Sequence, residues 1–145
     1  MPTPRSVVLT LVVFACGFAL GGLYDGSGFT ANAQSPKVFE LRTYTAPDGK
    51  LPNLLARFRD HTLQIFERHG MTNVGYWVPQ DAPASANTLI YILEHDSREA
   101  AAKSWEAFRA DPEWKRVADE SQVDGPIVSK VESVFMNATG FSPLK

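Results

Sequence analysis

The sequence is almost without cysteine, and neither sign of charge dominates it. The only cysteine among 145 residues is Cys16, which lies in an apolar run near the start. Its isolation excludes a disulfide scaffold, a cysteine-rich zinc site and a catalytic thiol from the rest of the chain. With 14 Lys and Arg against 16 Asp and Glu, the net charge is -2, so we expect no nucleic-acid partner. Hydrophobic residues make up 44% of the sequence, which excludes a disordered or collagen-like chain.

Common catalytic and metal-binding motifs are also missing. The sequence has no H-x-x-x-H, no H-E-x-x-H and no cysteine pair, so we predict no structural metal. A glycine-rich phosphate loop and a G-x-S-x-G elbow are absent as well, which argues against nucleotide-dependent and triad-hydrolase chemistry. No cofactor is predicted.

Residues 1–33 have the composition of an export signal. Arg5 precedes residues 6–23, which carry no charge, and Ala31-Asn32-Ala33 supplies the small residues that a signal peptidase requires. Cleavage after Ala33 would leave a domain of residues 34–145 in the periplasm or outside the cell. An uncleaved membrane anchor and lipidation at Cys16 are the alternatives.

Hydrophobic periodicity after the leader predicts four strands and two helical regions. Alternating side chains indicate strands at residues 38–44, 73–78, 89–94 and 127–136. Apolar residues three and four positions apart indicate helices at about residues 51–69 and from Ser97 onward, with a restart at Asp111-Pro112. The order β-α-β-β-α-β predicts an α+β, ferredoxin-like domain, in which a four-stranded antiparallel sheet carries both helices on one face.

The second face of this sheet needs a cover. We expect it to present Arg42, Tyr44, Tyr76 or Trp77, and Tyr91, a mixture too apolar for water and too polar for an ordinary core. A second copy of the sheet would bury this face, so a homodimer is predicted. A pocket is expected between the two sheets or in the gap between sheet and helices.

Five short motifs follow one another along the chain after the leader. They are Glu40-Leu41-Arg42-Thr43-Tyr44 before Gly49-Lys50, then Gly70, Val74-Gly75-Tyr76-Trp77, Asp111-Pro112-Glu113-Trp114 and Phe141-Ser142-Pro143. Over about residues 37–144 the chain resembles the NIPSNAP family. The resemblance implies a dimeric α+β barrel with face-to-face sheets, and it brings no agreed catalytic residues. Eukaryotic members are tied to mitochondria and vesicle traffic, but the export-type leader argues against transferring these roles.

His61, Arg42 and Tyr44 are the candidate catalytic residues. His61 falls on the predicted apolar stripe of the first helix, where it could be a general base, a haem or metal ligand, or a hydrogen-bonded core residue. Arg42 and Tyr44 point the same way from the first strand, so Arg42 could bind a carboxylate and Tyr44 could stack on a ligand. The alternative for Arg42 is an ion pair with Glu40 or Glu132.

Aromatic residues and two further histidines complete the candidates. Tyr76, Trp77, Tyr91 and Trp114 are predicted to wall a ligand pocket. Trp105 is predicted to belong to the core, and His69 to be structural at a helix C-terminus. His95, beside Glu94 and Asp96, is interpreted as a solvated strand end, with a metal cluster as the alternative.

Three functions are compatible with these residues. The first is an exported homodimer that binds a small aromatic or carboxylate ligand, or a protein partner, without catalysis. The second is a cofactor-independent monooxygenase or isomerase, which requires His61, Arg42 and Tyr44 to converge. The third is a haem-binding barrel with His61 or His95 as axial ligand. Nothing in the sequence decides whether the chain is an enzyme or which compound it takes.

Overall fold

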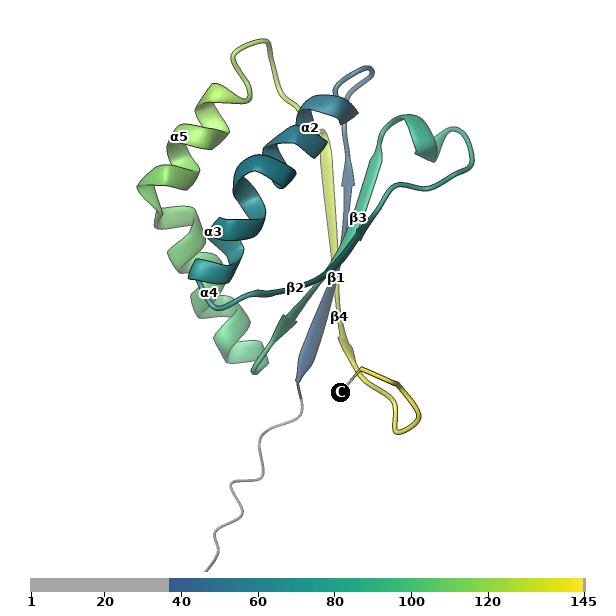
Figure 1. The fold of residues 1–145 in the computed structure, drawn as a ribbon, viewed down its shortest axis with the longest axis vertical. Helices are drawn as coiled ribbons and strands as arrows, with labels where there is room; N and C mark the ends of the chain where they lie inside the picture. The colour runs from purple at the N-terminus through teal and green to yellow at the C-terminus, as the bar shows by residue number, and fades with distance from the viewer. Residues whose placement is uncertain (1–36, 145) are drawn as a thin grey trace, which may run out of the picture. The chain divides into compact units, whose positions relative to one another are not determined.

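The computed structural model describes residues 37–144 (Figure 1). The predicted leader, its cleavage point and Cys16 lie outside these residues. Within residues 37–144, no helix is both long and apolar enough to cross a membrane.

Four antiparallel strands form one sheet in the order β2-β3-β1-β4. Their bounds are Val38–Thr45 for β1, Thr72–Trp77 for β2, Thr88–His95 for β3 and Lys130–Asn137 for β4. This order confirms the predicted ferredoxin-like α+β fold. The last strand begins at Lys130 rather than at the predicted Ile127. Ile127 is only 1% exposed and belongs to the core, in an irregular stretch before the strand ladder starts.

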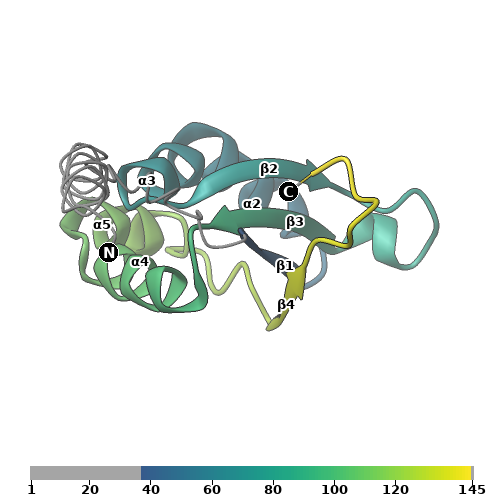
Figure 2. The ribbon, with the colours of Figure 1, turned by 90° about the horizontal axis from the view of Figure 1, so that it is seen from below.

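The helices cover one face of the sheet (Figures 1 and 2). A first helical segment consists of α2 (Leu51–Arg57), a π-helical turn η1 (Phe58–Thr62) and α3 (Leu63–Arg68), and a second of α4 (Arg98–Ala110) and α5 (Pro112–Glu120). The second predicted region is therefore two helices. They meet at Asp111, because its backbone is extended and Pro112 cannot continue a preceding helix.

The π-helical turn decides which side of the first helical segment faces the core. One extra residue in this turn shifts the buried stripe from Leu54 and Phe58 to Thr62, Ile65 and Phe66. Thr62 is 1% exposed, whereas His61 is only partly buried. The predicted place of His61 on the apolar stripe is therefore wrong, since a period of 3.6 residues does not hold across a π turn.

The alternation of side chains along the strands assigns them to two faces. Arg42 and Tyr44 of β1 point to the helices, because Arg42 lies over the Trp105 ring of α4 and Tyr44 meets the Phe58 ring edge-on. Tyr91 of β3 is fully buried on the same side, and Tyr76 of β2 stacks on it with ring centroids 5.3 Å apart.

The predicted exposure of Arg42, Tyr44, Tyr76 and Tyr91 on the uncovered face is therefore wrong. A two-residue period groups the side chains that share a face, but it does not say which face receives the helices. Of the residues named for the uncovered face, Trp77 alone lies there, paired with Ile90 of β3.

The uncovered side of the sheet, which we call the open face, has an apolar middle. It carries Phe39, Leu41 and Thr43 of β1, Ile90 and Ile92 of β3, Trp77 of β2 and Val134 of β4, and the register adds Glu94 of β3 and Lys130 and Glu132 of β4 to the same face. Trp77 is 50% exposed and Val134 is 55% exposed. The Trp77 ring folds back over Gly75, where an added Cβ would lie 2.6 Å from the ring, so any larger residue here would displace the Trp77 side chain.

Candidate functional site

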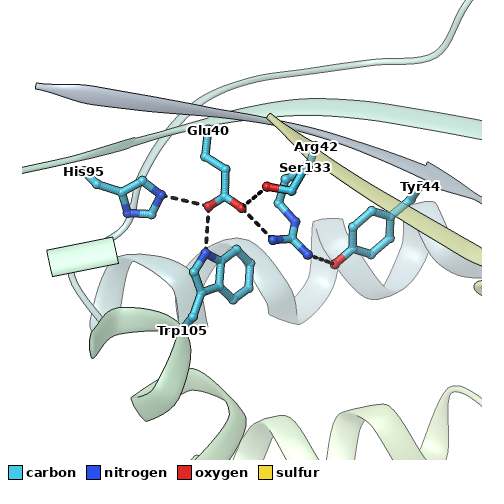
Figure 3. Close-up of polar contacts among 6 residues, drawn as sticks. All are labelled: Glu40, Arg42, Tyr44, His95, Trp105 and Ser133. Atoms are coloured by element: carbon cyan, nitrogen blue, oxygen red, sulfur yellow. Dashed lines mark hydrogen bonds and ion pairs between the residues drawn. The ribbon is translucent and has the colours of Figure 1, made fainter. Parts of the chain in front are cut away.

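Glu40 is a buried carboxylate at the centre of the sheet, with 1% of the residue exposed. Its Oε1 accepts hydrogen bonds from Arg42 Nη1 and Ser133 Oγ, each at 2.7 Å. Its Oε2 accepts from Trp105 Nε1 at 2.7 Å and from His95 Nε2 at 3.1 Å (Figure 3). Donors from β1, β3, α4 and β4 thus converge on one side chain and saturate it.

The pKa of Glu40 is set by opposing effects. Burial raises the pKa, but hydrogen bonds from His95, Ser133 and Trp105 and the charge of Arg42 lower it, so that it falls from the ordinary 4.5 to about 2. Glu40 is therefore ionised at neutral pH. Because an ionised carboxylate only accepts hydrogen bonds, the His95 ring carries a proton on Nε2.

Arg42 is held between Glu40 and two aromatic rings. Its guanidinium carbon lies 4.2 Å from the centroid of the Trp105 ring, and its Nη2 lies 3.5 Å from the Tyr44 hydroxyl. The alternative role predicted for Arg42, an ion pair with Glu40, is thus present in the structure. Burial lowers the pKa of Arg42, but interactions with Tyr44, Tyr91 and Glu40 raise it by more, so the net shift of the pKa is upward. The Arg42 Nε is buried without a hydrogen-bond partner, so one donor of a fixed cation remains unused.

A hollow of about 410 Å³ opens beside this cluster, and we call it the α4–β4 cleft. It is lined by Glu40, Arg42, Arg98, Ala102, Trp105, Arg109, Ser133 and Phe135. Four of these residues recur at helical spacing along one side of α4, with an arginine at each end and Trp105 between them. Arg98 also lies over the Phe135 ring of β4, 3.6 Å from its centroid.

The charge of the α4–β4 cleft is positive. Glu40 balances Arg42, whereas neither Arg98 nor Arg109 forms an ion pair with any residue among 37–144. Two cations without a carboxylate partner, next to the aromatic rings of Trp105 and Phe135, give the cleft the chemistry of a receptor for an aromatic anion.

The predicted pocket-wall residues lie elsewhere, since none of Tyr76, Trp77, Tyr91 and Trp114 lines the α4–β4 cleft. Tyr91 is 0% exposed, and its hydroxyl makes no hydrogen bond of good geometry. Burial raises the pKa of Tyr91 and of Tyr76, so both are neutral phenols in the core. Trp114 packs on Phe108, with ring centroids 4.3 Å apart.

The three histidines have separate environments. His61 lines a different hollow, between α2 and α5, and so does not meet Arg42, which lines the cleft, while Tyr44 lines neither of the two hollows. His69 Nε2 lies 2.6 Å from Asp111 Oδ2, next to the C-terminus of α3, which fits a structural role.

His95 is 2% exposed, so its interpretation as a solvated strand end is wrong. Strand β3 continues one residue past the predicted end, and the alternation turns His95 inward to Glu40. Among residues 37–144, no group of three or more His, Cys, Asp or Glu side chains is arranged to hold a metal ion.

The contributions of Trp105, Ser133, Arg98 and Arg109 to the site were not predicted. The helical spacing of Arg98, Trp105 and Arg109 is visible in the sequence and could have indicated a shared wall. Trp105 and Ser133 donate hydrogen bonds to Glu40 from 65 and 93 residues away in the sequence, respectively. No local sequence pattern indicates contacts over such separations.

Comparisons with known proteins agree on the family. The NIPSNAP family model matches residues 39–143. A NIPSNAP family protein of unknown function from Agrobacterium tumefaciens is 26% identical, with a TM-score of 0.66, and the match covers 77% of this chain and 96% of that one. An uncharacterised NIPSNAP-like domain protein from Burkholderia xenovorans is 18% identical, also with a TM-score of 0.66, over 77% of this chain and 93% of that one.

A more distant similarity links the chain to an enzyme. A monooxygenase from Streptomyces coelicolor, solved in complex with the ligand nanaomycin D, is 14% identical with a TM-score of 0.54, over 79% of this chain and 97% of that one. At this identity the likeness shows a shared fold only. No curated protein matches the chain significantly.

Proposed function

The protein belongs to the NIPSNAP family, and on this premise we propose that it is a homodimeric domain that binds a small aromatic carboxylate in the α4–β4 cleft. One observation carries the proposal. The Arg42 guanidinium is fixed over the Trp105 ring by a buried carboxylate, in a cleft with two further arginines that form no ion pair with any residue among 37–144.

The arrangement supports a ligand that is both flat and anionic. Arg42 covers one face of the Trp105 ring and Arg98 covers one face of the Phe135 ring, so the planar guanidinium groups provide the surfaces on which a flat ligand can stack. Arg98 and Arg109 offer charge-assisted hydrogen bonds at the two ends of the α4 wall. Glu40 accepts hydrogen bonds from four donors, one of which is Arg42. It therefore holds the Arg42 guanidinium in place and is not available as a general base.

We propose binding without turnover. Catalysis as predicted requires His61 to join Arg42 and Tyr44, and His61 lines another hollow. A haem ligand role for His95 is opposed by its burial, because the residue is 2% exposed and lines neither the α4–β4 cleft nor the hollow that contains His61.

Titration with 2-naphthoate tests the ligand class. We expect the anion to quench tryptophan fluorescence saturably, and we expect the uncharged 2-naphthylmethanol to bind at least tenfold more weakly, since it cannot pair with the arginines. The double variant Arg98→Ala, Arg109→Ala should lose about tenfold or more in affinity for 2-naphthoate.

Arg116→Ala is the matched control for this titration. Arg116 is exposed on α5 and paired with Glu120, outside the α4–β4 cleft, so its removal should leave affinity unchanged. Equal affinity for acid and alcohol, or full affinity in the double variant, would contradict the proposal.

The open face supports the homodimer. Trp77 and Val134 are about half exposed in a single chain, and Leu41, Ile90 and Ile92 are partly exposed, so a second copy of the sheet can cover them face to face. We also propose that the leader of residues 1–33 directs export and is removed, which would place the mature dimer in the periplasm or outside the cell.

Native mass spectrometry of the protein purified from its own compartment tests both proposals. We expect a dimer of the chain of residues 34–145. Val134→Glu should shift this dimer toward the monomer, because it places a charge within the apolar part of the open face. Val131→Glu is the matched control, since Val131 is exposed on the same strand but points to the side that carries the helices, and it should leave the dimer intact. A wild-type monomer would refute the dimer, and a full-length chain would refute cleavage after Ala33.

A further inference from the structure

A second hollow of about 300 Å³ lies between α2 and α5, and we call it the α2–α5 hollow. It is lined by Lys50, Asn53, Ala56, Arg57, Asp60, His61, Val117, Glu120, Ser121, Val123 and Asp124. None of these residues lines the α4–β4 cleft. Lys50, Asn53 and Arg57 recur three and four positions apart, so α2 turns one polar side toward this space.

Arg57 is the unusual member of this lining. It is only 7% exposed, and its one hydrogen bond among the described residues runs from Nη1 to Ser121 Oγ at 3.3 Å. Its Nε is buried without a partner. The guanidinium carbon lies 5.1 Å from the centroid of the Trp114 ring, which backs it from α5.

No carboxylate among residues 37–144 forms an ion pair with Arg57. Three acidic residues line the hollow: Asp60 pairs with Arg59, Glu120 pairs with Arg116, and Asp124 forms no ion pair with any described residue. Lys50 donates to the backbone carbonyl of Asp124 and has no carboxylate partner among residues 37–144. The hollow therefore contains a buried cation whose hydrogen-bonding capacity is largely unused.

A buried and unpaired guanidinium is unfavourable for folding, because transfer from water is not repaid by an opposite charge. A bound anion can offset this cost, because it supplies the opposite charge and the hydrogen-bond acceptors that the guanidinium lacks. The Arg57 Nε is buried out of reach of a ligand oxygen, whereas Nη2 is accessible and has no hydrogen-bond partner among the described residues. Nη2 and Nη1 together form the end of the planar guanidinium, whose two parallel N–H groups match the two oxygens of a carboxylate.

We propose that the α2–α5 hollow is a second binding site, which takes a small carboxylate on the Arg57 guanidinium. The site is independent of the α4–β4 cleft and of any ligand bound there. Asn53 and Ser121 line the same space and add neutral polar groups, while Lys50 adds a second positive charge at its rim.

The test follows the side-chain Nε–H resonance of Arg57 by ¹H–¹⁵N NMR in the wild-type protein. We expect a saturable shift of this resonance on titration with sodium acetate, and none with sodium chloride at the same ionic strength. The shift should persist in the Arg98→Ala, Arg109→Ala variant, so that a failure of the proposal for the α4–β4 cleft leaves this result intact. A resonance that does not move, or that moves equally with chloride, would overturn the proposal.

Substitution of Arg57 gives a second readout. Because Arg57→Met removes an unpaired buried charge and keeps the length of the chain, we expect its Tm without acetate to exceed that of the wild type. Arg59→Met, which removes an exposed arginine beside it, should leave the Tm near that of the wild type. A Tm for Arg57→Met well below that of the wild type would show that contacts within the ligand-free protein already stabilise the guanidinium. That result would overturn the proposal.

Discussion

Replacement of Glu40 by glutamine is expected to lower the free energy of unfolding by about 3–5 kcal/mol, the range for breaking a buried ion pair by removing one partner. All four groups that surround Glu40 are donors. An amide offers one acceptor oxygen, so its NH₂ group would face either the Arg42 guanidinium or the Trp105 indole N–H, and neither of these groups can accept a hydrogen bond. Arg42 would also lose the charge that balances it in the core.

Chemical denaturation measures this effect. Glu120→Gln is the matched control, because Glu120 lies on α5, away from the open face, and forms an exposed ion pair with Arg116. Its loss should change the free energy of unfolding by less than about 1 kcal/mol. Equal stability of the Glu40→Gln and Glu120→Gln variants would show that the buried cluster adds nothing to the fold.

The pH dependence of stability provides an independent check on Glu40. Its pKa is lowered in the folded protein, from 4.5 to about 2, so the folded state favours the ionised form. The resulting stabilisation is fully present above about pH 4.5 and is lost as the pH falls toward 2. The Glu40→Gln variant should lack this component of acid sensitivity, and the difference between the two proteins should shrink as the pH falls.

Replacement of Asp111 by alanine is expected to lower the free energy of unfolding by about 2–3 kcal/mol, since it removes a helix cap and a buried acceptor. Asp111 Oδ1 accepts from the backbone N–H groups of Glu113 and Trp114 at the start of α5. Its Oδ2 accepts from Arg68 at 2.8 Å and lies 2.6 Å from His69 Nε2. One carboxylate therefore both begins α5 and fastens it to the end of α3.

Thermal and urea unfolding check the effect of Asp111→Ala against Asp96→Ala. Asp96 is also ion-paired, with Lys37, but its side chain is 80% exposed, so its loss should change stability by less than about 1 kcal/mol. Hydrogen bonds from Arg68 and His69 lower the pKa of Asp111, so its contribution too is present at neutral pH and lost in acid. An Asp111→Ala variant as stable as Asp96→Ala would contradict this assignment.

The fold was predictable from the sequence because its signals are local. Period-two strands, the Gly49 and Gly70 positions and the Ser97 and Asp111 caps all lie within a few residues of the structure that they specify. Both glycines adopt positive φ, and both caps accept the expected backbone hydrogen bonds. The order of these elements leaves few topologies, and the ferredoxin-like arrangement is the common one.

The site was predictable only in part, for physical reasons that differ from residue to residue. The ion pair between Arg42 and Glu40 spans two positions of one strand, and it was foreseen. The burial of His95 depends on its hydrogen bond to Glu40, which is 55 residues away in the sequence. The two residues meet only because β1 pairs with β3. Tertiary packing determines which face of the sheet the helices cover. From the sequence alone, a charged pair such as Glu40 and Arg42 is assigned to the solvent side, because its buried hydrogen-bond partners cannot be identified.

The π-helical turn η1 has a consequence for comparing this chain with its relatives. A turn of this kind is equivalent to the insertion of a single residue into a helix that otherwise keeps its path. A relative with a regular helix here would be one residue shorter, although its loops would be the same length. An alignment should therefore place a one-residue gap within Phe58–Thr62, because a gap in the adjoining turn would bring the buried Ile65 opposite a solvent-facing position.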